Sequence, residues 1–192
     1  MTNAVILLLL ILFFFTSAIG VVTGSNSLIT VPVMFQFGID EKVAVATNMF
    51  GLTFMAVGGA IPFVRQNKIE IGRIMPMIVL TIVSSAIGAA LVGLITDQGI
   101  KLMVSIAMIA IAAFTLFRPD AGIKTQPAVG GRLALSYSIV FLLGIYGGLY
   151  SGGYVTILTS VLVVFFGMTF SESVAATKVI NVFSSLIASI VF

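Results

Sequence analysis

Residues 20–27, with the sequence GVVTGSNS, interrupt an apolar segment that extends from residue 4 to residue 37. A continuous helix over this segment would be far longer than the ~30 Å hydrocarbon core of a membrane, because each helical residue adds ~1.5 Å. The chain must therefore bend, re-enter or break near Gly24. A break frees backbone N–H and C=O groups that lipid does not satisfy, so such backbone is tolerated at membrane depth only inside protein or beside a wet cavity.

The composition of the whole chain is that of an integral membrane protein. Of its 192 residues, 60% are hydrophobic and 8% are charged, whereas an ordinary soluble domain carries about 25% charged residues. A soluble globular protein could not hide this much apolar surface from water, and a disordered chain needs the opposite balance. The net charge of +3 is too weak to indicate a nucleic-acid partner.

Six apolar stretches are candidate membrane-spanning helices, which need roughly 20 apolar residues each. They cover residues 4–22, 43–64, 74–95, 102–117, 133–150 and 174–192. Two shorter apolar stretches, 28–37 and 154–166, each follow a Gly- and Ser-rich break. We therefore predict an all-α integral membrane protein, a polytopic helical bundle with two internal repeats and Gly-rich helix breaks. The first stretch is predicted to be retained, because no Lys or Arg precedes Lys42 and a signal peptide begins with a positive region.

The charged residues lie almost entirely between these stretches and predict an orientation. The loop at residues 65–73 and the loop at residues 118–132 are both net positive, and two spans separate them. Both loops therefore lie on one side of the membrane, which the positive-inside rule makes cytoplasmic. The opposite side then carries Asp40, Glu41, Lys42, Asp97 and Lys101.

The second break resembles the first and indicates an internal duplication. Both copies have the same order of features: a break, an apolar run, a Gly, an acidic residue and a sequence with Ala and Thr. In the first copy these are residues 20–27, 28–37, Gly38, Glu41 and 43–48, and in the second 148–153, 154–166, Gly167, Glu172 and 174–178. Duplicated membrane units are a common plan of secondary transporters.

The repeat divides the chain into three predicted parts. Residues 1–120 form the first transmembrane repeat, residues 121–132 a cytoplasmic linker, and residues 133–192 an incomplete second repeat. The first copy continues through two more spans after its Ala-Thr-Asn sequence, so we expect the chain to be truncated at its C-terminus relative to its parent fold. The symmetry stays open, because repeats of four crossings would be parallel whereas an odd number of crossings would make them inverted.

Each break is also a candidate anion site. A helix that starts at a break presents free N–H groups and the positive end of its dipole, which attract anions. Ser25, Asn26 and Ser27 add side-chain donors at the start of the following helix. We predict that the two breaks face each other across a central anion site. For three glycines ahead of the second break we instead favour close helix packing, namely Gly144, Gly147 and Gly148.

Lys178 is the most informative polar residue, because a Lys at the centre of a membrane helix costs ~2.5–3.5 kcal/mol on insertion scales. It either lines a site or snorkels to the interface. Its neighbours favour a site, since one helical face carries Thr177, Lys178, Asn181, Ser184 and Ser185. Thr47 and Asn48 correspond to Thr177 and Lys178 in the first copy, although an interhelical hydrogen bond explains Asn48 almost equally well. The predicted substrate-binding residues are Gly24, Ser25, Asn26, Ser27, Thr47, Asn48, Ser151, Gly152, Gly153, Thr177, Lys178 and Asn181.

The sequence contains no Cys and no His, which removes thiolate nucleophiles, the usual metal ligands and the usual general base. No Asp or Glu lies clearly inside a predicted span, although a proton-coupled carrier usually needs a titratable group there. We therefore predict no enzyme activity, no catalytic residues, no metal and no cofactor. The expected partners are a small anionic substrate and the lipid bilayer, and no nucleic acid is expected. The sequence leaves open whether the chain forms a homo-oligomer.

The order of these motifs resembles the sulfite exporter TauE/SafE family of membrane permeases. The resemblance is carried by the first break with Pro32, Gly38, an acidic turn and Ala-Thr-Asn, then a basic loop, and by the second break with Ala-Ala-Thr-Lys at 175–178. It implies transport of a small anion such as sulfite, a sulfonate or a related organic acid across a prokaryotic cytoplasmic membrane. The first copy has the sequence GSNS at residues 24–27, where the family has a run of glycines.

The sequence leaves three functions to be weighed. The favoured one is a secondary carrier in which the two repeats rock around a central anion site. An alternative is a non-transporting membrane scaffold or subunit that uses its Gly motifs for helix packing. A membrane-embedded enzyme is poorly supported, because the chain lacks His, Cys and paired intramembrane carboxylates.

Overall fold

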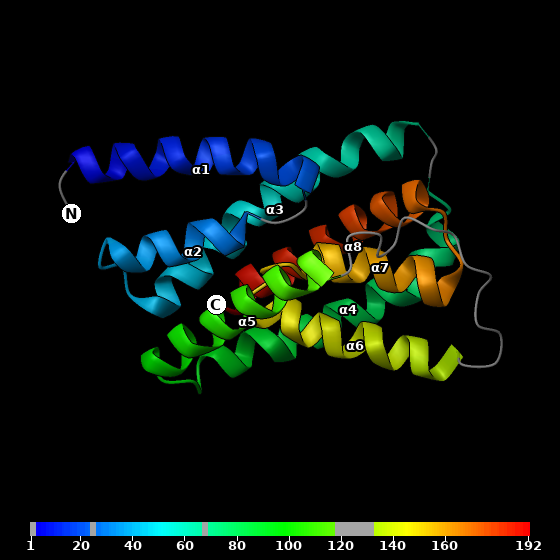
Figure 1. Cartoon of the computed structure of the whole chain (residues 1–192). Helices are drawn as coiled ribbons and strands as arrows, with labels where there is room; N and C mark the ends of the chain where they lie inside the picture. The colour runs from blue at the N-terminus through cyan, green and yellow to red at the C-terminus, as the bar shows by residue number, and fades with distance from the viewer. Residues whose placement is uncertain (1–2, 24–25, 67–68, 118–132) are drawn as a thin grey trace.

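The computed structural model describes residues 3–23, 26–66, 69–117 and 133–192 (Figure 1). These ranges contain eight α-helices and no β-strand, which confirms the predicted all-α bundle. The helices are α1 (Asn3–Thr23), α2 (Ser27–Gln36), α3 (Glu41–Arg65), α4 (Ile71–Val92), α5 (Asp97–Phe117), α6 (Leu133–Leu149), α7 (Tyr154–Phe166) and α8 (Phe170–Val191).

Two of these helices, α2 and α7, are too short to cross a membrane. They have 10 and 13 residues and so extend for ~15 and ~20 Å, against a hydrocarbon core of ~30 Å. In contrast, α3, α4, α5 and α8 are each long and apolar enough to cross it. Four of the six predicted spans correspond to these helices. The other two, at residues 4–22 and 133–150, form α1 and α6, which lead into the breaks.

Both half-length helices end in the same kind of turn. Gly38 follows α2 and Gly167 follows α7, and their φ angles are 74° and 61°, a conformation that residues with a side chain rarely adopt. The next helix then begins with a side-chain cap. Asp40 accepts hydrogen bonds from two backbone N–H groups of α3, and Thr169 forms a capping box with Glu172 at the start of α8. The turn that follows each apolar run is therefore encoded in a similar way in both copies.

These two turns lie at opposite ends of the molecule. Glu41 in the first turn of α3 forms a 2.6 Å ion pair with Lys101 in α5, so the α2–α3 turn lies where α4 ends and α5 begins. Arg73, near the start of α4, donates a 2.7 Å hydrogen bond to the carbonyl oxygen of Phe166 at the end of α7. The α7–α8 turn therefore lies where α4 begins, which is the other end of that helix.

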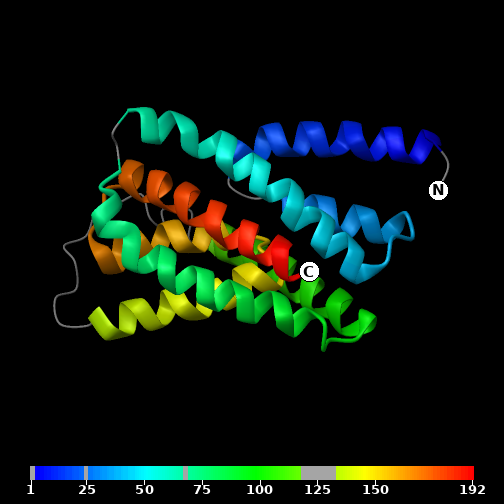
Figure 2. The same cartoon turned by 180° about the vertical axis from the view of Figure 1, so that it is seen from behind.

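The two copies are consequently inverted with respect to each other. Helices α1 and α2 form a hairpin that enters from one end of the molecule, and α6 and α7 form a hairpin that enters from the opposite end (Figure 1 and Figure 2). Helices α3 and α8 pack against each other between the hairpins and run in opposite directions. Inversion is one of the two symmetries that the sequence left open, and it is common among secondary transporters. The linker predicted at residues 121–132 lies outside the described residues.

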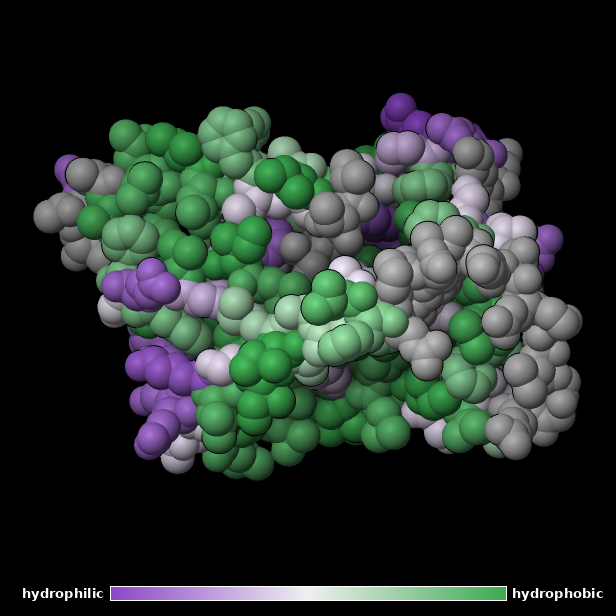
Figure 3. All heavy atoms as spheres, viewed as in Figure 1, coloured by the Kyte–Doolittle hydropathy of each residue, from purple (hydrophilic) through white to green (hydrophobic). Residues whose placement is uncertain are grey.

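The surface has the character expected of a membrane protein. Figure 3 shows hydrophobic side chains over the flank of the molecule, with most of the hydrophilic ones gathered toward its two ends. Large apolar side chains point outward from the helices, and Phe14, Phe54 and Ile109 are 64–70% exposed. Contiguous apolar surface of this kind is unfavourable in water, whereas lipid tails solvate it.

Helices α4 and α6 approach each other closely through glycines. A Cβ atom added at Gly148 would lie 2.1 Å from the carbonyl oxygen of Ser85, and one added at Gly144 would lie 1.9 Å from the hydroxyl oxygen of Ser84. On the other side of the contact, a Cβ atom at Gly88 would lie 2.1 Å from a backbone oxygen of α6. The packing interpretation of Gly144 and Gly148 is therefore confirmed, and α4 is held tightly to α6.

Replacing Gly148 with Ala is expected to destabilise the protein, because the added methyl group would push α4 away from α6. Overpacking of this kind costs ~1–3 kcal/mol. The matched control is Gly58→Ala, where a Cβ atom meets nothing within 4 Å and the better helix former is neutral or stabilising by at most ~1 kcal/mol. Thermal unfolding in detergent measures both variants. Equal unfolding midpoints for the Gly148→Ala and Gly58→Ala variants would contradict the close α4–α6 contact.

Inverted hairpins predict which positions share a side of the membrane. The chain has no Cys, so single cysteines can be introduced without background labelling at four exposed positions, in the variants Gln36→Cys, Gln98→Cys, Gln66→Cys and Ser171→Cys. A membrane-impermeant thiol reagent is expected to label the first two from one side and the last two from the other, which is the cytoplasmic side by the positive-inside rule. Labelling of the Ser171→Cys variant from the same side as the Gln36→Cys variant would contradict inversion.

Candidate functional site

The two helix breaks meet at the centre of the bundle. The hydroxyl of Tyr150, in the second break, donates a 3.0 Å hydrogen bond to the carbonyl oxygen of Ser27 at the start of α2. A Cβ atom added at Gly152 would lie 3.0 Å from the side chain of Leu28. The structure thus brings the breaks together, as the sequence predicted, although Gly24 and Ser25 lie outside the described residues.

Asn48 ties the first break to α3. Its side-chain oxygen accepts a 2.7 Å hydrogen bond from Thr30, and its side-chain nitrogen donates a 2.9 Å hydrogen bond to the Ser27 hydroxyl. Asn48 is fully buried, and both hydrogen bonds run from α3 to α2. The interhelical hydrogen bond that the sequence left as an alternative for Asn48 is therefore present, and this side chain orients the start of the half-helix.

The second copy contains a corresponding contact at a shifted position. Thr159 in α7 donates a 3.3 Å hydrogen bond to Thr177 in α8. The two partners are 18 residues apart, as are Thr30 and Asn48. By this contact Asn48 corresponds to Thr177, not to Lys178 as the sequence comparison predicted. Thr47 is exposed on α3 and lies outside the cluster, because adjacent helical residues face different directions.

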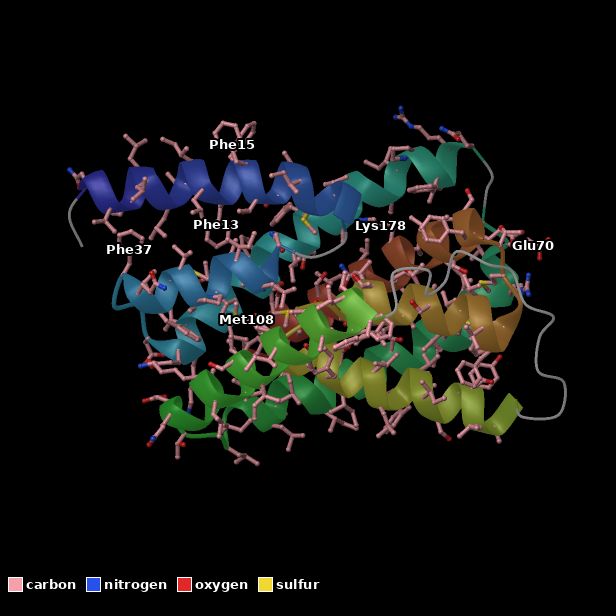
Figure 4. The ribbon with its side chains drawn as sticks, in the orientation of Figure 1. Phe13, Phe15, Phe37, Glu70, Met108 and Lys178 are labelled. Atoms are coloured by element: carbon pink, nitrogen blue, oxygen red, sulfur yellow. The ribbon has the colours of Figure 1, made fainter. Side chains whose placement is uncertain are left out.

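Lys178 is buried rather than extended toward the interface. Its side chain reaches from α8 toward the end of α1 (Figure 4), where its ammonium group donates a 2.6 Å hydrogen bond to the carbonyl oxygen of Val21. Its aliphatic part packs where Gly59 leaves room on α3. The residue is 4% exposed and is the only charged residue in the buried core among the described residues. The ammonium group lies where the two copies meet, and no described acidic side chain is buried beside it.

The breaks also direct helix ends toward this charge. Helices α2 and α7 start at the centre from opposite sides, so the positive ends of both dipoles point inward. The N-cap of α2 is Asn26, whose side chain makes no capping hydrogen bond, and the N-cap of α7 is Gly153, which has no side chain to offer. The N–H groups of Ile29 and Tyr154 already donate to the carbonyl oxygens of Asn26 and Ser151, and other first-turn N–H groups that lack a cap can bind an anion. Together with Lys178, these helix ends form an electropositive centre.

Two buried amides border this centre. The side-chain nitrogen of Asn26 donates a 3.3 Å hydrogen bond to Ser17 on α1, but its side-chain oxygen has no partner, and neither has the side-chain oxygen of Asn181. Asn26 lies near Met55. A Cβ atom added at Gly20 would lie 3.0 Å from the Asn26 side chain and 3.1 Å from the Met55 sulfur. Met55 precedes Gly59 by one turn on α3, and Asn181 follows Lys178 by one turn on antiparallel α8. Asn26 and Asn181 therefore lie at a similar depth.

The structure gathers most of the predicted substrate-binding residues around the centre. Asn26, Ser27 and Asn48 lie at the first break, which Tyr150 links to the second break with Ser151, Gly152 and Gly153. Thr177, Lys178 and Asn181 lie on α8, and the side chain of Lys178 contacts Gly59, 11 residues or ~16 Å beyond Asn48 along α3. The sequence analysis missed Thr30 and Tyr150, which connect the breaks to their surroundings. A Thr lies 18 residues before Asn48 and another lies 18 residues before Thr177. This repeated spacing was a signal for Thr30. No sequence pattern indicates the hydrogen bond from Tyr150 to a backbone carbonyl oxygen.

Comparison with known proteins places these features in a family. The family model for the sulfite exporter TauE/SafE matches residues 9–192. The chain belongs to the TauE/SafE family. No solved structure matches it. The family is one of membrane transporters, and the apolar helices and inverted hairpins described above have the architecture of such proteins.

Three curated relatives of this TauE/SafE chain carry names of the same kind. It is 27% identical to a "Probable membrane transporter protein" of Haemophilus influenzae over 92% of its length, and 23% identical to the "Probable membrane transporter protein ORF9" of a Sinorhizobium species over 89%. It is 23% identical to the "Probable membrane transporter protein YfcA" of Escherichia coli K12 over 86%. The matched segments cover 69%, 66% and 61% of these relatives.

Replacing Asn48 with Ala is expected to destabilise the protein, because the Ser27 hydroxyl would lose its buried partner and the Thr30 hydroxyl would keep only the carbonyl oxygen of Asn26. An unsatisfied buried polar group costs ~1–3 kcal/mol. The neighbouring Thr47→Ala variant is the control, since exposed substitutions usually change stability by less than ~0.5 kcal/mol. Thermal unfolding in detergent should show a clear loss for the first variant alone. A larger loss for Thr47→Ala would show that the two faces of α3 are assigned incorrectly.

Proposed function

We propose that this transporter moves a small anion, such as sulfite, a sulfonate or a related organic acid, across the cytoplasmic membrane of a prokaryote. Membership of the TauE/SafE family supports transport rather than catalysis. The observation that carries the choice of an anion is the buried ammonium group of Lys178, at the centre of two inverted hairpins. The bacterial relatives support the assignment to a prokaryotic membrane.

The electrostatics of the centre favour an anion over a cation or a neutral solute. No described Asp or Glu is buried, so the described residues offer Lys178 no carboxylate as a partner. An uncompensated charge at membrane depth is costly, and a bound anion would lower that cost. The starts of α2 and α7 act in the same direction, because half-helix N-termini bind anionic groups in transporters of this general design.

In the state described, Lys178 is occupied by the carbonyl oxygen of Val21. An entering anion would compete for the ammonium group and release the end of α1. Binding would then be coupled to the position of the α1–α2 hairpin relative to α8. In an inverted-repeat carrier the two hairpins exchange roles as the site opens first to one side and then to the other. Lys178 would therefore bind the anion and, by releasing the carbonyl oxygen of Val21, allow the first hairpin to move.

The Lys178→Met variant is expected to lose anion binding and transport while it remains folded and inserted, because Met retains the length of the side chain without its charge. A hydrogen bond to a charged group contributes ~1.5–3 kcal/mol, so affinity should fall by about 10- to 100-fold. Lys42→Met, at the end of the molecule, is the matched control. Uptake into proteoliposomes and thermal shifts with sulfite, a short sulfonate and acetate measure the two variants.

Unchanged transport by the Lys178→Met variant would contradict the role of this residue. If the unmodified protein is well folded but is stabilised by none of these anions, the anion proposal itself is wrong. In that case the glycine contacts between α4 and α6 favour the alternative of a membrane scaffold, and isolation of a stable partner would be the next measurement.

A further inference from the structure

A second polar cluster lies in the interior, where α6 approaches the break. The hydroxyls of Ser85 in α4 and Ser184 in α8 are 2.7 Å apart. The Ser85 hydroxyl also donates a 3.0 Å hydrogen bond to the carbonyl oxygen of Gly144 in α6. Tyr154, the first residue of α7, packs beside them, since its ring and the Ser184 hydroxyl both lie within 3.2 Å of a Cβ atom added at Gly147. Four helices thus contribute oxygen atoms to this cluster.

Several of these oxygen atoms lack a hydrogen-bond partner. The Tyr154 hydroxyl lies beside the hydroxyls of Thr81 and Ser184, but neither it nor the Thr81 hydroxyl makes a well-formed hydrogen bond. The side-chain oxygen of Asn181, one turn before Ser184 on α8, is the third such atom. All three residues are at most 1% exposed. Each unsatisfied buried group costs ~1–3 kcal/mol, so the cluster is suited to a ligand that accepts their lone pairs.

The chemistry of the cluster selects a class of ligand. It consists of hydroxyl, amide and backbone carbonyl oxygens, without a buried Asp or Glu among the described residues. Oxygen atoms are the preferred ligands of hard cations, and sites for Ca²⁺ and Mg²⁺ are usually built on carboxylates. A neutral set of oxygens suits a small monovalent cation better. Carbonyl groups at the C-terminal ends of half-helices coordinate Na⁺ in inverted-repeat transporters.

The inverted repeat supplies an independent argument. The C-terminal ends of α1 and α6 are equivalent, and each presents carbonyl groups and the negative end of a dipole. At the end of α1 this negative potential is met by a cation, the ammonium group of Lys178. At the end of α6 the described residues supply no buried cationic side chain. The hydroxyl cluster lies beside the last turns of α6, at Gly144 and Gly147.

We propose that Thr81, Ser85, Tyr154, Asn181 and Ser184, together with the carbonyl end of α6, form a binding site for Na⁺. In the carrier described under Proposed function, on which this part of the inference rests, the ion would be transported with the anion. Asn181, a member of the cation site, lies one turn from Lys178 on α8, so the two ligands would be close enough to stabilise each other. By linkage, Na⁺ would then raise the affinity for the anion, and the anion would raise the affinity for Na⁺.

The first experiment measures the cation site alone. The full chain in detergent, without added anionic substrate, is titrated with NaCl at constant ionic strength, against KCl and against the chloride of a large organic cation. We expect a saturable rise of the unfolding midpoint with Na⁺ that neither other cation reproduces. Identical curves for the three cations would overturn the proposal and would indicate that the cluster holds only water.

Three variants locate the site. Ser184→Ala and Tyr154→Phe each remove one hydroxyl oxygen, and each is expected to shift the Na⁺ midpoint at least about tenfold to higher concentration. Ser138→Ala is the matched control, because the Ser138 hydroxyl is exposed and bonds only within its own helix. If either cluster variant fails to fold, the other one still tests the site. Unchanged Na⁺ midpoints in both folded variants would overturn the assignment.

A second experiment separates this site from the anion site. The Lys178→Met variant is expected to lose the response to anions but to retain the stabilisation by Na⁺, because Lys178 is not a ligand of the cation site. Uptake of a radiolabelled anion into proteoliposomes with and without an inward Na⁺ gradient then tests coupling. In the unmodified protein, stabilisation by Na⁺ without any anion binding would contradict only the proposed function, whereas gradient-independent uptake would contradict only the coupling.

Discussion

The structure depends on the need to satisfy backbone groups that two helix breaks expose at membrane depth. Lipid offers these N–H and C=O groups no hydrogen bonds. Each break is therefore buried against the other copy, where Tyr150 bonds the carbonyl oxygen of Ser27, and against its own following helix, where Asn48 bonds Ser27 and Thr30. The same requirement makes α2 and α7 half-length, since each must run from the protected centre to one surface. Burial of the breaks thus produces the central site.

Each break creates two helix ends of opposite polarity, and this explains the distribution of polar residues. The starts of α2 and α7 are positive and the ends of α1 and α6 are negative. Lys178 satisfies the end of α1 and adds its charge to the two positive starts. Around the end of α6 the sequence places hydroxyls at Ser85 and Ser184. An anion and a small cation can therefore be held only a few side chains apart, which lowers the cost of bringing either charge into the membrane.

The all-α fold, the breaks and most helix limits could be predicted from the sequence, because span length, caps and glycines act locally. The inverted symmetry could not, since it depends on a contact such as Arg73 with Phe166, 93 residues apart. The site was predicted in part. Lys178 stands out because a charge in an apolar helix is rare, but its partner is a backbone carbonyl, which no residue type indicates. The pairing of Asn48 with Lys178 was wrong by one residue, and a shift of one residue turns a side chain by about 100° around a helix.

The two hairpins are held by different forces, and this determines which of them a substrate can move. Helix α6 is fixed to α4 by backbone contacts at Gly88 and Gly148, which leave no room for sliding or rotation without loss of packing. Helix α1 is held to the second copy by the hydrogen bond from Lys178 to Val21, a polar contact for which an anion can compete. A charged hydrogen bond contributes ~1.5–3 kcal/mol, which is within the range that a bound substrate can offset. In the proposed carrier, the substrate would therefore act first on the α1–α2 hairpin, because the α4–α6 contact holds the second hairpin more tightly.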